Sequence, residues 1–330
     1  MNPELSVEIG DLVLPNPVGV ASGTFGYGSE YESLMDVDAL GALYTKAVTP
    51  EPRPGNNVPR IVETPSGMLN SIGLANPGLE AFVREKLPEL RGRRCPVIVN
   101  VAGAYEDDYV RVVERLEAED GIAGYEINVS CPNVSHGGLA FGTDPGLVER
   151  LTERLRALLR TRRIREGVAD SDAKHGTEAH DGSTLRRPLI VKLSPNVTDI
   201  TEIARAAEAG GADGVSCINT LVGMAVDVER RKPRLARCTG GLSGPAIRPV
   251  GVACVFRVSR VLGIPVIGIG GILEARDALE YLLAGARAVQ VGTGIFRNPD
   301  TSSRVLAGIR DWMVRNRVAR ISDIPKMLDI

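Results

Sequence analysis

The segment Asn-Val-Ser-Cys-Pro-Asn at residues 128–133 concentrates side chains that could do chemistry. Asn128 and Asn133 carry amides that can both donate to and accept from the polar edge of a ligand. Cys131 stands between them, and the proline that follows it restricts the chain. A single cysteine is commonly an inert buried side chain, but the polar neighbours of Cys131 argue against an apolar surrounding. We therefore interpret this segment as a candidate site, with residues 134–138 as a loop able to cover it.

Two lysines, Lys46 and Lys192, stand at the ends of short apolar runs. Burying a lysine is costly unless an anion or a strong acceptor meets its ammonium group. We expect a ligand to play that role. The alternative is a pair with an acid inside the fold. The only acid at a strand end is Glu126, which stands two residues before Asn128 and so shares its face unless the strand bends.

Two small-residue pairs, Gly270-Gly271 and Gly292-Thr293, follow the last two apolar runs. Glycine lets the backbone approach a ligand closely, and free N–H groups at a helix start can face an anion. Any turn after a strand also favours glycine, so each pair alone is a weak signal. Together they predict a site for a phosphorylated ligand.

Eight short runs rich in Val and Ile must position these side chains, and segments of helical period separate most of them. Near-continuous apolar strands are typical of a parallel sheet covered on both faces. The sequence therefore predicts a single-domain (β/α)8 barrel with loop insertions over residues 1–330, whose active site lies at the carboxyl ends of the strands. The predicted strands are Val18–Ala21, Ala42–Thr45, Val97–Val101, Tyr125–Val129, Leu189–Leu193, Gly214–Ile218, Val266–Ile269 and Ala288–Val291.

Three segments show the signals of helices that pack on the barrel. Asp144 and the proline after it are suited to begin a helix whose leucines recur at helical spacing through residue 159. Thr198–Ala209 and Glu274–Ala284 show the same pattern, and each is followed by a glycine suited to a helix C-terminus.

Two segments interrupt the alternation of strands and helices. Glu166–Thr184 is polar and carries two of the three histidines, so we interpret it as a surface insertion and not as a metal site. Val222–Gly241 is rich in arginine and lysine. We interpret it as a solvated loop, and the alternative is a loop that faces a partner protein.

The composition excludes several classes of protein. The net charge of −2 offers no general attraction for nucleic acid or an anionic membrane. Five cysteines without a C-x-x-C pair predict reduced thiols in the cytoplasm, with neither a disulfide framework nor a zinc or iron–sulfur site. Residues 1–14 lack the pattern of a signal peptide. No apolar run reaches the length of about 18 residues that spans a membrane.

The chain resembles the class 1 dihydroorotate dehydrogenases over about residues 5 to 315. The segment at 128–133 is similar to the catalytic segment of that family, and Asn70-Ser71-Ile72-Gly73-Leu74 is similar to its orotate-binding loop. Three further matches follow in the family's order, at residues 191–196, 218–220 and 241–245. The insertion Glu166–Thr184 departs from the family, which has a short link there.

The resemblance also implies a subclass. Class 2 enzymes have an N-terminal membrane helix and a serine base, and this chain shows neither. Gly-Leu-Ser-Gly-Pro-Ala-Ile at 241–247 is more similar to class 1B than to class 1A. Class 1B implies FMN in this chain and a partner subunit with FAD and a [2Fe-2S] cluster, in a heterotetramer with two copies of each subunit and with NAD+ as final acceptor.

The resemblance assigns roles residue by residue. Cys131 removes a proton from C5 of dihydroorotate while C6 gives a hydride to the flavin. The implied FMN-binding residues are Ser22, Lys46, Ala47, Asn100, Asn128, Lys192, Ile218, Gly244, Gly270, Gly271, Gly292 and Thr293. The implied substrate-binding residues are Lys46, Asn70, Ser71, Ile72, Gly73, Leu74, Asn128, Asn133, Asn196, Asn219 and Thr220.

Three alternatives stay open at this point. The first is class 1A, a homodimer that reduces fumarate. The second is a flavin-binding barrel that acts on uridine in tRNA, which the net charge of −2 disfavours. The third is a barrel that binds phosphate without redox chemistry, such as an aldolase, and a flavin spectrum of the purified protein would exclude it.

Overall fold

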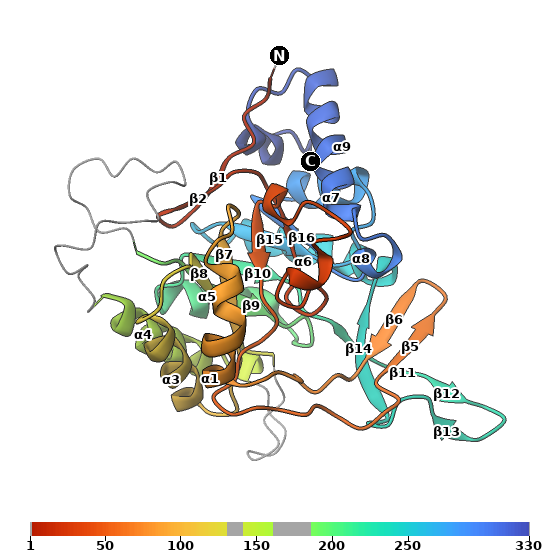
Figure 1. Ribbon diagram of the computed structural model, residues 1–330. Helices are drawn as coiled ribbons and strands as arrows, with labels where there is room; N and C mark the ends of the chain where they lie inside the picture. The colour runs from red at the N-terminus through yellow and green to blue at the C-terminus, as the bar shows by residue number, and fades with distance from the viewer. Residues whose placement is uncertain (1, 131–140, 161–185, 330) are drawn as a thin grey trace.

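Eight parallel strands form a closed barrel at the centre of the molecule (Figure 1). The computed structural model describes residues 2–130, 141–160 and 186–329. Around the barrel the strands follow the order β10-β15-β16-β3-β4-β7-β8-β9. Their bounds are β3 Val18–Val20, β4 Ala42–Tyr44, β7 Val97–Val101, β8 Gly124–Asn128, β9 Leu189–Leu193, β10 Gly214–Cys217, β15 Val266–Ile269 and β16 Ala288–Val291. Each end lies within one residue of its prediction, so the predicted (β/α)8 barrel is confirmed.

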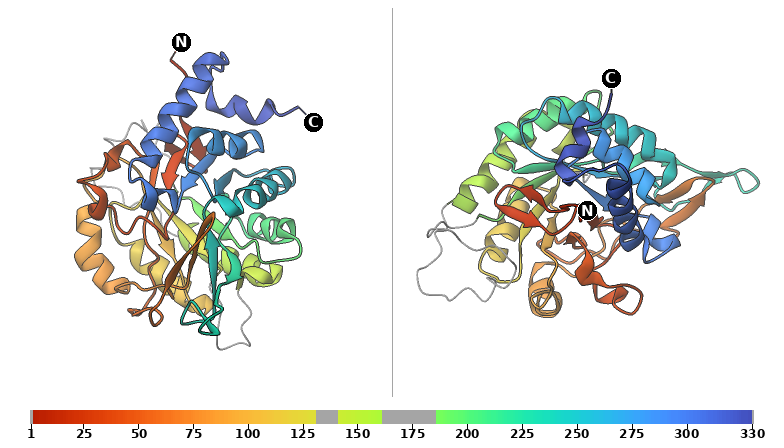
Figure 2. Two further views of the ribbon diagram at one scale, coloured as in Figure 1. Left: turned by 90° about the vertical axis from the view of Figure 1, so that its right-hand side faces the viewer. Right: turned by 90° about the horizontal axis from the view of Figure 1, so that it is seen from above.

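Helices cover the outside of the barrel (Figure 2). All eight strands are buried along their whole length, because helices lie outside them and packed side chains lie inside. The helices are α1 Leu79–Ala81, α2 Leu87–Leu90, α3 Glu106–Leu116, α4 Pro145–Arg160, α5 Ile200–Ala209, α6 Arg248–Ser259, α7 Ala275–Leu283, α8 Gly294–Arg297 and α9 Thr301–Arg315. Short 3-10 or π turns are η1 Ser29–Tyr31, η2 Val37–Ala39, η3 Phe82–Lys86, η5 Phe141–Thr143, η7 Pro245–Ile247 and η8 Ile321–Lys326.

Aspartate side chains cap the starts of two of the predicted helices. The Asp144 carboxylate accepts from the N–H of Leu147 at 3.0 Å at the start of α4. Helix α5 begins two residues later than predicted, because the Asp199 carboxylate accepts from the N–H of Thr201 at 2.9 Å and caps the helix there. None of the helices among residues 2–130, 141–160 and 186–329 is long and apolar enough to cross a bilayer.

A small hairpin closes the amino-terminal end of the barrel. Strands β1, Val7–Ile9, and β2, Leu12–Leu14, pair antiparallel. Ile9 is fully buried, and a Cβ placed on Gly214 at the start of β10 would lie 3.3 Å from its side chain. Both chain ends lie on this side of the molecule (Figure 1). The carboxyl end of the barrel, which we call the mouth, is therefore the end left for a ligand.

A second sheet stands beside the mouth. It is antiparallel in the order β11-β14-β6-β5, with β5 Ile61–Thr64, β6 Gly67–Asn70, β11 Leu221–Met224 and β14 Thr239–Ser243. A further hairpin, β12 Val226–Asp227 with β13 Lys232–Pro233, projects from the body (Figures 1 and 2). The prediction of a loop at Val222–Gly241 was therefore wrong. These strands are short and rich in glycine, and one of their partners, β6, lies far away in the sequence.

Candidate active site

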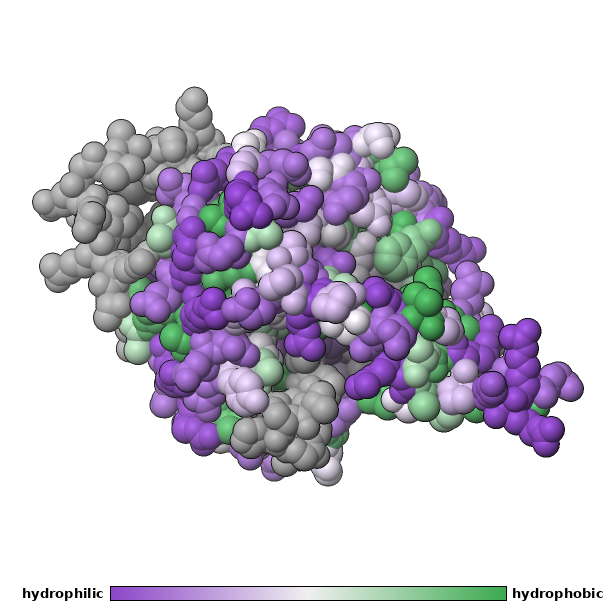
Figure 3. Space-filling view, turned by 60° about the horizontal axis from the view of Figure 1, so that its bottom comes forward, coloured by the Kyte–Doolittle hydropathy of each residue, from purple (hydrophilic) through white to green (hydrophobic). Residues whose placement is uncertain are grey.

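The mouth face is largely hydrophilic and is hollowed near its centre (Figure 3). Strands of a (β/α)8 barrel deliver the side chains at their carboxyl ends to this region. Two layers of polar side chains lie there. We call the deeper layer, made of Asn100, Glu126, Lys192, Ser216 and Gln290, the floor. We call the outer layer of asparagines the rim; it consists of Asn70, Asn128, Asn196 and Asn219.

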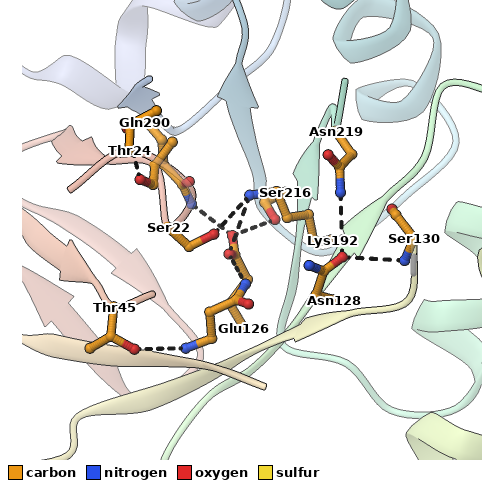
Figure 4. A network of polar contacts seen from close by, with 12 residues as sticks. Ser22, Thr24, Thr45, Glu126, Asn128, Ser130, Lys192, Ser216, Asn219 and Gln290 are labelled. Carbon is orange, nitrogen blue, oxygen red and sulfur yellow. Dashed lines mark hydrogen bonds and ion pairs between the residues drawn. The ribbon is translucent and has the colours of Figure 1, made fainter. Parts of the chain in front are cut away.

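The floor is organised around one carboxylate (Figure 4). Glu126 on β8 is fully buried. One carboxylate oxygen accepts from Ser216 Oγ at 2.8 Å and from Gln290 Nε2 at 2.9 Å. The other accepts from Asn100 Nδ2 at 2.6 Å and lies 3.5 Å from Lys192 Nζ. A carboxylate this deep requires such partners, because an unpaired buried charge would cost several kcal/mol.

The ion pair with Glu126 is the alternative for Lys192, a pair with an acid inside the fold. The expectation that a ligand also meets its ammonium group stays a prediction. Glu126 does lie on the same side of β8 as Asn128, as the two-residue repeat of a strand requires. Lys192 Nζ also donates to Ser22 Oγ at 3.2 Å. Within the described ranges, its ammonium group thus makes one hydrogen bond and one ion pair.

Two floor acceptors lack donors. Asn100 Oδ1 and Gln290 Oε1 are buried and have no hydrogen-bond partner within residues 2–130, 141–160 and 186–329. A buried acceptor without a partner loses about 1–3 kcal/mol of hydrogen-bonding free energy. Together with the donors of Lys192, they suit a flat heterocycle that carries both an N–H and carbonyl oxygens. The floor therefore has the donors and acceptors to hold a polar ring system.

The rim asparagines bond mainly to one another and to the backbone. Asn128 Oδ1 accepts from Asn219 Nδ2 and from the N–H of Ser130, both at 3.3 Å. The Asn128 carbonyl accepts from the hydroxyl of the buried Tyr109 at 3.0 Å, which fixes the end of β8. These amide bonds are long for N–H···O contacts. Replacing these hydrogen bonds by bonds to a ligand would therefore cost little free energy.

Asn196 and Asn70 attach the second sheet to the rim. Asn196 Nδ2 donates to the Thr220 carbonyl, and Asn196 Oδ1 accepts from the N–H of Val222, both at 2.9 Å. Asn70 Nδ2 donates to the Gly241 carbonyl at 3.3 Å. Since a Cβ on Gly241 would collide with Thr220, these residues are in close contact. The segment Asn70-Ser71-Ile72-Gly73-Leu74 thus begins near Thr220, through Gly241. Its role in substrate binding stays a prediction.

Glycines form a second wall of the mouth. Gly244, Gly270 and Gly271 have φ values of +95°, +128° and +70°, which side chains rarely allow. A Cβ on Gly271 would lie 2.8 Å from the Gly244 carbonyl oxygen. Gly292, followed by Thr293 at the start of α8, lies against Ala21, next to Ser22. The two glycine pairs therefore converge, and their bare backbone suits a phosphate better than a side chain would.

Three more predicted cofactor residues lie at strand ends. Ala47 and Ile218 are buried beside the mouth. Lys46 is half-buried and has no carboxylate partner within the described part of the chain. Lys46 is thus available to an anionic ligand in a way that Lys192 is not.

The predicted catalytic residue Cys131 and the predicted substrate contact Asn133 lie outside the described residues, as does the insertion Glu166–Thr184. The residues from 2 to 130, 141 to 160 and 186 to 329 contain no cluster of potential metal ligands. Burial raises the pKa of the Cys217 thiol at the end of β10, which shares a hydrogen bond with the free thiol of Cys254 on α6.

Sequence reasoning missed two floor residues, Ser216 and Gln290, and named Glu126 only as a possible partner for a lysine. Ser216 and Gln290 are each the single polar side chain of a buried strand, in Val-Ser-Cys and Val-Gln-Val, and Glu126 shares β8 with Asn128. A polar side chain in such a run must find partners inside the barrel. A single polar residue in an apolar run was therefore the signal that could have identified these residues.

Comparisons with known proteins agree with this geometry. Residues 4–313 match the family described as "Dihydroorotate dehydrogenase". A protein of Trichlorobacter lovleyi is 49% identical over 324 residues, covering 98% of both chains. Proteins of Pelobacter propionicus and Desulforamulus reducens are each 47% identical, over 100% and 98% of both chains. All three are named "Dihydroorotate dehydrogenase B (NAD(+)), catalytic subunit". The chain belongs to the dihydroorotate dehydrogenase family.

Proposed function

We propose that this member of the dihydroorotate dehydrogenase family oxidises (S)-dihydroorotate to orotate, a step of de novo pyrimidine (UMP) synthesis, with NAD+ as the final acceptor. One observation carries the proposal. The buried floor around Glu126 offers hydrogen-bond donors together with acceptors that lack a donor, and the amides of the rim lie above it. Such a site suits two stacked polar rings, one on the floor and one under the rim. The relatives named as NAD(+)-dependent catalytic subunits support the choice of acceptor.

The floor and the glycine wall fit FMN. The orphan acceptors Asn100 Oδ1 and Gln290 Oε1 suit the ring N–H of an isoalloxazine, and Lys192 suits its carbonyl oxygens. The glycine pairs suit a terminal phosphate. The chemistry that FMN supplies when bound is acceptance of the hydride released from C6 of the substrate. The residues that we propose to hold it are Ser22, Lys46, Ala47, Asn100, Asn128, Lys192, Ile218, Gly244, Gly270, Gly271, Gly292 and Thr293.

The rim would hold the substrate. Its amides match the imide edge of the dihydroorotate ring, and Lys46 supplies a cation for the carboxylate. Cys131, which directly follows Ser130 at the edge of the rim, would take the proton from C5. A free thiol with a pKa of about 8.5 is only about 3% thiolate at pH 7, so nearby donors must favour the thiolate. The substrate residues are Lys46, Asn70, Ser71, Ile72, Gly73, Leu74, Asn128, Asn133, Asn196, Asn219 and Thr220.

Electrons must leave the barrel through a second protein. The sequence contains no dinucleotide-binding fingerprint, so we propose a partner subunit with FAD and a [2Fe-2S] cluster that carries the site for NAD+. The assembly would contain two copies of each subunit, and each catalytic chain would be one barrel domain. The words "catalytic subunit" in the names of the relatives support a partner.

The test is an acceptor assay. The purified chain is mixed with dihydroorotate and NAD+, alone and with the partner subunit, and NADH formation is followed. We expect slow NADH formation alone and rapid formation with the partner. Rapid NADH formation by the chain alone would contradict the two-subunit scheme, and rapid fumarate reduction would favour class 1A. Mass measurement of the released cofactor checks FMN; FAD as the only flavin would contradict our account of the phosphate site.

A further inference from the structure

A cavity of about 480 Å³ lies where the amino-terminal ends of α6, α7, α8 and α9 meet. Three arginines line it: Arg248, Arg297 and Arg304. Arg248 forms ion pairs with Asp277 and with Glu280. Arg297 and Arg304 are exposed and have no carboxylate partner within the described ranges. The cavity thus presents two uncompensated cations.

The two acids in the cavity wall do not cancel these cations, because helix capping already engages them. Asp277 accepts from the N–H groups of Leu273 and Glu274 at 2.8 and 3.1 Å and also binds Arg248. Glu274 takes part in the capping box of α7. The cavity is therefore a preformed site for an acidic group from another molecule.

An exposed aromatic side chain stands next to the cavity arginines in the sequence. Phe296, directly before Arg297 on α8, is 55% exposed. Interfaces are enriched in aromatic residues and arginine, and these residues dominate binding energies. The combination of Phe296 with three arginines is typical of a protein-binding surface.

This surface is continuous with the proposed flavin site. Helix α8 begins at Gly294, directly after Gly292-Thr293. Gly294 packs against the loop that follows Gly271, since a Cβ on it would lie 2.6 Å from the Ile272 carbonyl oxygen. The loops that follow β15 and β16 thus carry the glycine pairs on one side and line the cavity on the other. A protein bound here would sit beside the flavin.

We propose that the cavity and Phe296 form the docking surface for the electron-transfer subunit, whose acidic side chains bind Arg297 and Arg304. The proposal rests on the proposed function. The proposed occupant is the electron-transfer subunit and not a second copy of this chain, because a second copy would fit poorly. A two-fold interface would place the same arginines on both sides, where they would repel one another.

The test compares two double variants of the flavin-loaded chain by calorimetric titration with the electron-transfer subunit. Arg297→Glu/Arg304→Glu should weaken binding roughly 100-fold at low ionic strength. Wild-type binding should itself weaken as salt is added. Arg287→Glu/Arg315→Glu makes the same charge change at the amino-terminal end of the barrel and at the far end of α9, on exposed residues. This control should bind within about threefold of wild type.

Phe296→Ala provides a second variant without a charge change, and it should bind about tenfold more weakly. Wild-type affinity in either flavin-loaded cavity variant overturns the proposal. So does a changed oligomeric state of the variant chain alone in sedimentation, since that would make the surface a contact between copies. Flavin reduction by dihydroorotate in the isolated variants should stay at the wild-type rate. If the wild-type chain itself fails to reduce its flavin, the proposed function fails instead.

Discussion

The floor and the rim contain similar polar side chains but differ in how tightly those side chains are bonded. In the floor, four groups converge on the fully buried Glu126, three of them through hydrogen bonds of 2.6–2.9 Å. In the rim, Asn128 and Asn70 make long amide bonds of 3.3 Å, whereas the exposed Asn196 bonds to the backbone of Thr220 and Val222 at 2.9 Å. The floor is thus a fixed electrostatic base, and the long bonds at Asn128 and Asn70 are the exchangeable contacts of the rim. Changes in the floor should affect folding, and changes at the rim should affect the ligand.

The largest effect should come from Cys131→Ala, next to the rim. Loss of a general base typically lowers turnover by about 10²- to 10⁴-fold. Flavin content and the free energy of unfolding should stay unchanged, because only the proton acceptor is lost. Cys131→Ser should recover activity only at high pH, since a hydroxyl is a far weaker base. Stopped-flow flavin reduction by Cys131→Ala at the wild-type rate would mean that another residue is the base.

Glu126→Gln should produce the largest loss of stability. The glutamine would leave Lys192 buried without its counter-ion and would turn an amide N–H toward the other donors. Removing one partner of a buried ion pair costs about 3–5 kcal/mol. The free energy of unfolding is measured by urea denaturation without flavin. Asp323→Asn, which removes surface ion pairs with Lys326 and Arg320, should change it by less than about 1 kcal/mol. Equal stability of the two variants would refute the distinction between floor and surface.

Gly271→Ala should have an intermediate effect on cofactor binding. Its φ of +70° and the carbonyl 2.8 Å from a new Cβ leave no room for a methyl group. We expect a cost of about 1–3 kcal/mol and faster loss of flavin on dialysis. Gly92→Ala is the matched control, because a Cβ there meets nothing within 4 Å and Gly92 lies before β7, at the amino-terminal end of the barrel. Equal flavin retention by both variants would exclude the glycine wall as a phosphate site.

The smallest effect should come from Asn219→Ala. Its Nδ2 makes one long bond to Asn128 and its Oδ1 accepts from the N–H of Thr220 at 2.8 Å, so the free energy of unfolding should fall by only about 1 kcal/mol. Loss of one ligand hydrogen bond should weaken orotate binding about tenfold, as measured by titration of the flavin absorbance. Asn316→Ala, which removes only a bond to the Trp312 carbonyl, is the control. Unchanged orotate affinity in Asn219→Ala would remove this residue from the substrate site.

The barrel could be predicted from the sequence because its signals are local. Each strand is a continuous apolar run, and Asp144 marks the start of α4 in the residues themselves. The fold also determines which ends meet, so the convergence of Lys192, Asn128 and Asn219 followed from strand order alone.

The second sheet and the arginine cavity were not predicted, and the ion pair of the floor was named only as an alternative, because all three depend on contacts between segments that are far apart in the sequence. Asn70 pairs with Gly241 across 171 positions, and no local pattern near Gly240 or Gly241 indicates a strand. The ion pair between Glu126 and Lys192 requires the register of β8 against β9. The arginine cavity combines four helices, α6, α7, α8 and α9, that the sequence does not show to be neighbours.

The central claim is that this barrel itself carries out the oxidation of dihydroorotate at a bound flavin. The most direct test mixes the purified, flavin-containing chain with dihydroorotate in the absence of oxygen and of any partner, and follows the flavin absorbance. We predict complete bleaching, with release of orotate in an amount equal to the flavin. A flavin that stays oxidised under these conditions, in a chain that binds orotate, would contradict the account.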